Sequence, residues 1–171
     1  WDPTYTDESW IGEPVYLIPR MQAWVDEYYP GTQLAITEYN WGGLEALNGA
    51  LAQADVLGIF GSQGLGLATL WGPPSSGQPG AYAFRMYLNY DGHGRGFGET
   101  SVQASSADQG QLSIYAAERA GDGALTLMII NKTAAALTST LSLAGFEPAS
   151  SAQVYRYSGE YLNAIRQQPN Q

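Results

Sequence analysis

Hydrophobic residues along the first ninety positions alternate between helical and strand-like spacing. Leu44, Leu47, Leu51 and Leu57 lie along one face of an expected helix, whereas the run at 33–38 is short and mostly apolar, as in a buried parallel strand. The same reasoning predicts three helices and two buried strands. They are helices over 20–28, 44–60 and 81–90, and strands over 33–38 and 67–71.

This alternation of helix and strand predicts an α/β architecture, because helices that join parallel strands pack onto the sheet. Two strands are too few for a covered sheet, and far too few for a closed eight-stranded barrel. Residues 1–98 are therefore expected to be part of a larger α/β domain.

The remaining residues, 99–171, have a different pattern. A glycine-rich segment at 92–98 is expected to connect the two regions. After it, short stretches of β pattern are separated by turn residues at intervals typical of a sandwich. These stretches are 101–105, 112–119, 124–131, 137–143 and 152–157. In one of them Leu137, Leu141 and Leu143 alternate with Thr and Ser, as in a sheet with one solvated face. We expect an incomplete β-sandwich domain.

Composition narrows the classes of function. Seven Lys and Arg stand against 16 Asp and Glu, for a net charge of −9, and charged residues make up only 13% of the chain. Without a basic patch, binding to nucleic acid or an anionic membrane is not expected. No apolar run approaches the ~20 residues of a spanning helix. Cysteine is absent, which excludes thiol nucleophiles and disulfide frameworks.

The most informative segment is 36–42, Ile-Thr-Glu-Tyr-Asn-Trp-Gly. It places Glu38 at the carboxyl end of an expected strand, where the catalytic groups of α/β barrels lie. A carboxylate there can attack an anomeric carbon, while Tyr39 and Asn40 can bind sugar hydroxyls or orient the carboxylate. The alternative is a Glu that only caps or salt-bridges at a strand end.

Aromatic side chains favour a carbohydrate ligand. Trp71 ends the second expected strand, so it should lie on the same rim as Glu38 and offer a flat face to a sugar ring. Trp1, Trp10 and Trp41 also fall in or near expected loops. The alternative for each is packing in the core, where Trp is mostly buried.

Several long motifs resemble glycoside hydrolase family 44. They are Trp-Asp-Pro-Thr-Tyr at 1–5, Asp-Glu-Ser-Trp-Ile at 7–11, Leu-Ile-Pro-Arg-Met at 17–21, Ala-Ile-Thr-Glu-Tyr-Asn-Trp-Gly at 35–42, Asn-Gly-Ala-Leu-Ala-Gln-Ala-Asp at 48–55, Leu67 to Pro74, and Tyr-Asp-Gly at 90–92. The resemblance is strong over residues 1–100 and looser beyond. It implies secreted bacterial endo-β-1,4-glucanases and xyloglucanases, built as a (β/α)₈ TIM-like barrel followed by a β-sandwich domain.

The resemblance further implies a retaining mechanism with two glutamates. Glu38 matches the nucleophile on the seventh barrel strand, and Trp71 matches the aromatic residue after the eighth. Trp10 and Trp41 are expected to stack on sugars, and Tyr39 and Asn40 to position them. The family's acid/base residue lies on the fourth strand, and this chain is expected to start after the sixth. The isolated chain is therefore expected to show negligible hydrolysis.

The expected partner is a β-glucan such as cellulose, carboxymethyl-cellulose or xyloglucan. A separate N-terminal fragment could complete the barrel. No cofactor is required, although calcium as a structural ion is compatible with the resemblance. The alternative function is a non-catalytic glucan-binding fragment, which would keep the aromatic platform and perform no chemistry.

Overall fold

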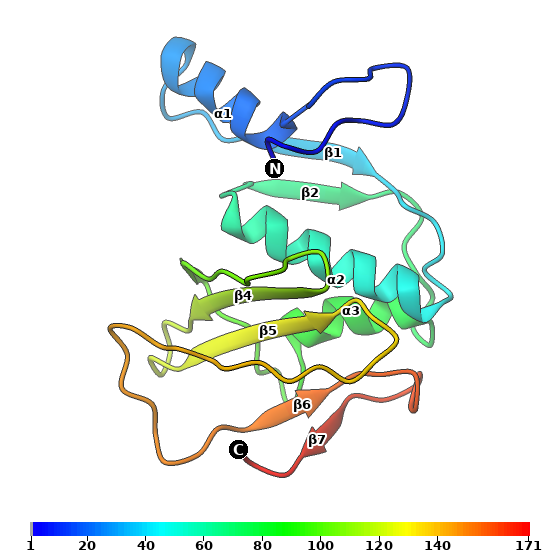
Figure 1. Ribbon diagram of the computed structural model, residues 1–171, viewed down its shortest axis with the longest axis vertical. Helices are drawn as coiled ribbons and strands as arrows, with labels where there is room; N and C mark the ends of the chain where they lie inside the picture. The colour runs from blue at the N-terminus through cyan, green and yellow to red at the C-terminus, as the bar shows by residue number, and fades with distance from the viewer. Residues whose placement is uncertain (1) are drawn as a thin grey trace. The chain divides into compact units, whose positions relative to one another are not determined.

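The computed structural model describes residues 2–171, so Trp1, one of the tryptophans considered for sugar stacking, lies outside the described residues. The helices and strands appear in Figure 1. They are α1 (Leu17–Tyr28), β1 (Ala35–Tyr39), α2 (Leu47–Ser62), β2 (Leu67–Leu70), α3 (Pro79–Leu88), β3 (Thr100–Val102), β4 (Leu112–Glu118), β5 (Leu125–Asn131), β6 (Val154–Arg156) and β7 (Arg166–Gln168). The expected order of the first five elements is confirmed. Within the described chain, no helix combines the length and the apolar character needed to cross a membrane.

The chain divides into two compact units. Unit 1 holds the residues up to Asn40 together with Leu57–Gly72, and unit 2 holds Trp41–Val56 together with Pro73–Gln171. Helix α2 contributes residues to both. The expected domain boundary at 98/99 and its assignment to a barrel portion and a sandwich stay predictions.

Unit 1 contains α1 and the parallel pair β1–β2. Parallel pairing is as predicted, with Ala35 opposite Leu67 and Ile36 opposite Ala68. The prediction that both strands are buried is wrong, because only Tyr39 among their residues is buried. A parallel sheet is buried only when further strands and helices cover its edges and faces, and this sheet has two strands. Helix α1 buries Ile18 and Val25 but leaves Trp24 and Tyr28 exposed.

The β strands of unit 2 form a three-stranded antiparallel sheet, β3–β4–β5, and a separate two-stranded sheet, β6–β7. Strands β4 and β5 pair over seven residues, from Leu112 opposite Asn131 to Glu118 opposite Leu125. Five apolar residues of β4 and β5 are buried and form the core beside this sheet. They are Tyr115, Ala116, Ala117, Met128 and Ile130.

One predicted strand does not form. Residues 137–143 have no regular structure, and Leu137, Leu141 and Leu143 are exposed. Alternating leucines form a strand only when another strand pairs with the backbone and an apolar surface covers the leucines, and neither is present for this segment in the described residues. At β7 a strand forms that the hydrophobic pattern does not predict. Its sequence, Arg-Gln-Gln, contains no hydrophobic residue, and the segment is a strand because its backbone pairs with β6.

A polar contact network joins α2 to the β4–β5 sheet inside unit 2. The carboxylate of Asp55 accepts a hydrogen bond from the Tyr115 hydroxyl at 2.7 Å and pairs with Nζ of Lys132 at 2.6 Å. Gln109 donates to the same Tyr115 oxygen. Burial is the main cause that raises the pKa of Tyr115, and its hydrogen bond to Asp55 adds to the shift. The hydroxyl therefore stays protonated and donates.

Candidate active site

The candidate site is built where β1 and β2 end. The carboxyl ends of parallel strands meet at one edge of a sheet, so Glu38 and the residues around it come close to Trp71. The backbone N–H of Trp71 donates to the carbonyl of Tyr39 at 2.9 Å, which continues the β1–β2 pairing one residue beyond β2. This edge is the one that α/β barrels use for catalysis.

Glu38 lies in an irregular stretch of β1. Ile36 pairs with Ala68 and Tyr39 pairs with Leu70, so three residue steps on β1 oppose two on β2. A bulge of this kind re-aims a side chain and is frequent next to active sites. The side chain of Glu38 is exposed while that of its neighbour Tyr39 is buried.

Tyr39 and Asn40 both contact other parts of unit 1. Tyr39 is 8% exposed, and its ring packs edge-on against Phe60 of α2, with centroids 5.4 Å apart. Asn40 donates from Nδ2 to the carbonyl oxygen of Trp71 at 2.8 Å. The amide thereby ties the end of β1 to the residue after β2. Gly72 allows the chain to turn there with a positive φ of 76°.

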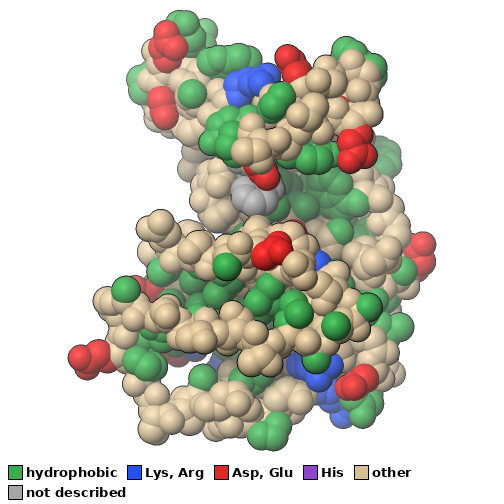
Figure 2. All heavy atoms as spheres, in the orientation of Figure 1, with side chains coloured by type: hydrophobic (Ala, Val, Ile, Leu, Met, Phe, Trp, Pro, Cys, Tyr) green, Lys and Arg blue, Asp and Glu red, His purple; other side chains and the backbone are tan. Residues whose placement is uncertain are grey.

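The tryptophans are exposed rather than packed in a core. Trp71 is 67% exposed, Trp41 is 50% exposed and Trp10, in a turn of the N-terminal segment, is 94% exposed. Figure 2 shows hydrophobic side chains at the surface in several places on the face it draws. The alternative of core packing therefore does not hold for these three side chains within this chain.

The strand ends bring together Glu38, Tyr39, Asn40 and Trp71, all of unit 1. Trp10 belongs to the same unit, but no hydrogen bond or ring contact joins it to Glu38 in the described residues. Trp41 follows Asn40 directly and begins unit 2. All the roles assigned from the sequence stay predictions: catalysis for Glu38, and substrate binding for Trp71, Trp10, Trp41, Tyr39 and Asn40.

The acids of the N-terminal segment make local turns. Asp2 accepts hydrogen bonds from the hydroxyl and backbone N–H of Thr4, and Asp7 accepts from Ser9 in the same way. These bonds, led by those from the hydroxyls, lower the pKa of each carboxyl. Among residues 2–171, no group of three or more His, Asp or Glu side chains gathers to hold a metal. Calcium as a structural ion stays a prediction.

Sequence reasoning did not select a hollow in unit 2, lined by side chains of α3, the turn after it and the β6–β7 hairpin. The signal in the sequence was the aromatic content of 81–90 followed directly by a glycine-rich turn. Periodicity alone does not show that β6 and β7 fold back onto this helix.

The chain is similar in sequence and structure to known endoglucanases. The chain is 37% identical over 163 residues to endoglucanase A of Paenibacillus lautus, covering 92% of the chain and 23% of the relative. Among solved structures, CelM2, a bifunctional glucanase-xylanase from a metagenome library, is 46% identical with a TM-score of 0.92. Cel44A, a family 44 endoglucanase from Clostridium thermocellum, is 36% identical with a TM-score of 0.85. The matches cover 99% of this chain but only 33% and 34% of the two solved chains. No family model matches the chain.

The shared fold, at these levels of identity, places the chain among the glycoside hydrolases. More narrowly, the chain belongs to glycoside hydrolase family 44 and corresponds to a C-terminal part of its members. It spans about a third of the length of the solved relatives and about a quarter of the endoglucanase from Paenibacillus lautus.

Proposed function

We propose that this chain is part of a retaining endo-β-1,4-glucanase that hydrolyses β-1,4-linked glucans, and that it supplies the nucleophile and part of the substrate cleft. The observation that carries the proposal is the position of Glu38 one residue before the end of a parallel strand, whose last residue, Tyr39, is hydrogen-bonded through its carbonyl to the exposed Trp71. The endoglucanase names of the relatives support the same reaction class. In the whole protein, β1 and β2 would be two strands of a (β/α)₈ barrel and β3–β7 would belong to a β-sandwich.

The proposed chemistry has two steps. The Glu38 carboxylate attacks the anomeric carbon and forms a glycosyl ester, while the glycosidic oxygen leaves and takes a proton from a second carboxylic acid. That second group then removes a proton from water, which attacks the anomeric carbon and releases Glu38. The two carboxyl groups of a retaining pair lie about 5–5.5 Å apart.

The second carboxylic acid is proposed to come from a part of the barrel that this chain does not contain. A separate N-terminal fragment, or the preceding part of a longer protein, would supply it and cover the open edges of β1 and β2. Trp71, Trp41 and Trp10 would stack on sugar rings. The substrate would be cellulose, carboxymethyl-cellulose or xyloglucan, acted on outside the cell.

Two experiments test this proposal. The first replaces the corresponding third of the bifunctional glucanase-xylanase with this chain and measures release of reducing ends from carboxymethyl-cellulose. We expect activity in the hybrid and a loss of at least about 10³-fold for Glu38→Gln, because the covalent step is removed. Glu45→Gln is the matched control, since Glu45 is also exposed but lies beyond the strand end, in the loop before α2.

A chemical readout separates a nucleophile from a structural carboxylate. Azide should rescue the Glu38→Ala hybrid and give an α-glycosyl azide, because the small anion takes the place of the missing nucleophile. Rescue that gives the β-azide, or no dependence of activity on Glu38, would refute the assignment. Turnover by the isolated 171-residue chain that Glu38→Gln abolishes would refute the proposal that the acid lies elsewhere.

The second experiment addresses the alternative of a non-catalytic binding fragment. Electrophoresis of the isolated chain in gels that contain xyloglucan measures binding without turnover. Retardation that Trp71→Ala reduces, together with an inactive hybrid, would favour the binding fragment over the enzyme.

A further inference from the structure

A second concave site lies entirely within unit 2. It is a hollow of about 550 Å³ between α3, the turn that follows it and the β6–β7 hairpin. Its volume falls in the range of small-molecule sites. Tyr82 and Arg85 line it from α3, His93 from the turn, and Tyr155, Ile165 and Gln167 from the hairpin side.

The α3 wall of this hollow is held in place by ring contacts and a hydrogen bond within unit 2. The ring of Tyr82 stacks on Tyr157 with centroids 5.0 Å apart and 9° between the planes, and its hydroxyl donates to the carbonyl of Asn163. The guanidinium of Arg85 lies over the Tyr82 ring, 4.5 Å from the centroid. Because a stacked guanidinium has lost much of its rotational freedom already, a ligand that it binds costs less entropy.

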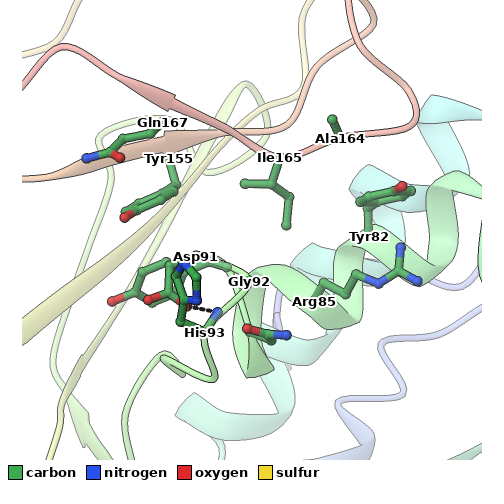
Figure 3. A pocket seen from close by; sticks show the side chains of 11 residues that line it. Tyr82, Arg85, Asp91, Gly92, His93, Tyr155, Ala164, Ile165 and Gln167 are labelled. Atoms are coloured by element: carbon green, nitrogen blue, oxygen red, sulfur yellow. Dashed lines mark hydrogen bonds between the residues drawn. The ribbon is translucent and has the colours of Figure 1, made fainter.

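The hairpin wall presents one face to the hollow. Tyr155 of β6 is directly opposite Gln167 of β7, so both side chains lie on the same side of the hairpin. Tyr155 packs against Tyr90 at a centroid distance of 4.9 Å. Figure 3 shows the Ile165 side chain pointing into the space between Tyr155 and Tyr82, and His93 on the side opposite Tyr155.

The turn after α3 is also ordered by its own contacts. Oδ1 of Asp91 accepts hydrogen bonds from the backbone N–H groups of His93 and Arg95, and Oδ1 of Asn89 accepts from Gly94. The carboxylate of Asp91 lies 3.6 Å from the guanidinium of Arg95. The rim therefore keeps its shape without a ligand.

The chemistry of the lining favours one ligand class. An isoleucine and a tyrosine supply an apolar surface, while a guanidinium, an imidazole and a primary amide supply planar groups that hydrogen-bond hydroxyls. The lining holds one guanidinium, that of Arg85, and one carboxylate, that of Asp91, which itself lies 3.6 Å from Arg95. It therefore presents no cluster of like charges that would select an ion. A sugar ring combines an apolar C–H face with a polar edge and carries no charge.

We propose that this hollow is a binding site for a neutral oligosaccharide, built by α3, its following turn and the β6–β7 hairpin. The proposal does not depend on the role of Glu38, because every residue it uses belongs to unit 2. In the intact protein such a site would hold a stretch of glucan chain on the β-rich part of the molecule.

The test is a residue-specific titration of the ¹⁵N-labelled 171-residue chain with cellotetraose, observed by NMR. We expect saturable shifts at the side-chain N–H signals of Gln167, Arg85 and His93, and about tenfold weaker binding in Arg85→Met, from the loss of hydrogen bonds to a charged group. Arg156→Met is the control, since Arg156 does not line this hollow but a neighbouring one, beside Arg166, which has only Gln167 in common with it. His93→Ala is a second variant at an exposed position that should also weaken binding and leave the remaining spectrum unchanged.

Three results would overturn the proposal. They are no saturable shift at these side chains, equal affinity in Arg85→Met and Arg156→Met, and inorganic phosphate binding in place of cellotetraose. A titration in Trp71→Ala distinguishes the two sites, because the unit 2 shifts should persist while shifts at the β1–β2 strand ends are lost. If Trp71→Ala abolishes the unit 2 shifts as well, the separate site does not exist.

Discussion

The contact between α2 and the β4–β5 sheet predicts a specific loss of stability. Asp55→Ala removes a carboxylate that is bonded to Tyr115 at 2.7 Å and to Lys132 at 2.6 Å. The side chains of Asp55 and Lys132 keep only 17% and 25% of their exposure, so both charges have lost most of their water. The substitution therefore leaves an ammonium group and a phenol without their shared acceptor.

The magnitude follows from these contacts. A hydrogen bond to a charged group contributes about 1.5–3 kcal/mol, and removing one partner of a fully buried pair costs about 3–5 kcal/mol. Lys132 can recover some hydration through its exposed quarter, and Tyr115 keeps its bond from Gln109. We expect Asp55→Ala to lower the free energy of unfolding by about 2–3 kcal/mol, which corresponds to a drop in Tm of about 5–10 °C for a chain of this size.

The assay is urea unfolding followed by tryptophan fluorescence, with Asp55→Asn as the matched variant. The amide of this variant would keep an oxygen acceptor for Tyr115 but would lack the charge that pairs with Lys132, so its loss of stability should be smaller. A double-mutant cycle with Lys132→Met should give a coupling of about 1–3 kcal/mol. A change below about 0.5 kcal/mol for Asp55→Ala, or a coupling of zero, would show that the network does not stabilise the fold.

Two further predictions concern stability. In α2, Gly49→Ala should be strongly destabilising, because its Cβ would lie 2.0 Å from the carbonyl oxygen of Gly43, whereas Gly61→Ala in the same helix meets nothing within 4 Å and should stabilise by about 0.5–1 kcal/mol. Equal unfolding midpoints for the two variants would contradict this. Arg119 hydrogen-bonds Asp122 and lowers the pKa of its carboxyl to about 2. The stability from this pair is thus present above the ordinary value of 3.8 and is lost as the pH falls from there toward 2. Asp122→Asn should flatten the acid side of the stability curve in that window, and an unchanged slope would argue against the pair.

The local pattern of the sequence was enough to predict the first five elements. Helical spacing of leucines marks α2, and short apolar runs mark β1 and β2, because these signals depend on neighbouring residues only. The pattern was insufficient at 137–143 and at β7. In both places the outcome depends on whether a partner strand lies alongside, which residues far away in the chain decide.

The candidate site, too, could be predicted from the sequence only in part. The motif around Glu38 and its place near a strand end could be recognised from the sequence, and so could the family. The bulge at Glu38, the burial of Tyr39 against Phe60 and the bond from Asn40 to Trp71 could not, because each joins residues from different elements or depends on the register between them.

The amino-acid sequence by itself determined the order of the first helices and strands, the acidic and aromatic character of the chain, the absence of cysteine and the motifs of glycoside hydrolase family 44. Only the tertiary structure decided which side chains meet. It exposed Trp71, bonded Asp55 to both Lys132 and Tyr115, and made Tyr155, Gln167 and Arg85 line one hollow. The physical reason is that periodicity depends on residues a few positions apart. A binding surface depends on contacts between segments far apart in the chain, such as that between Tyr82 and Asn163, which are 81 residues apart.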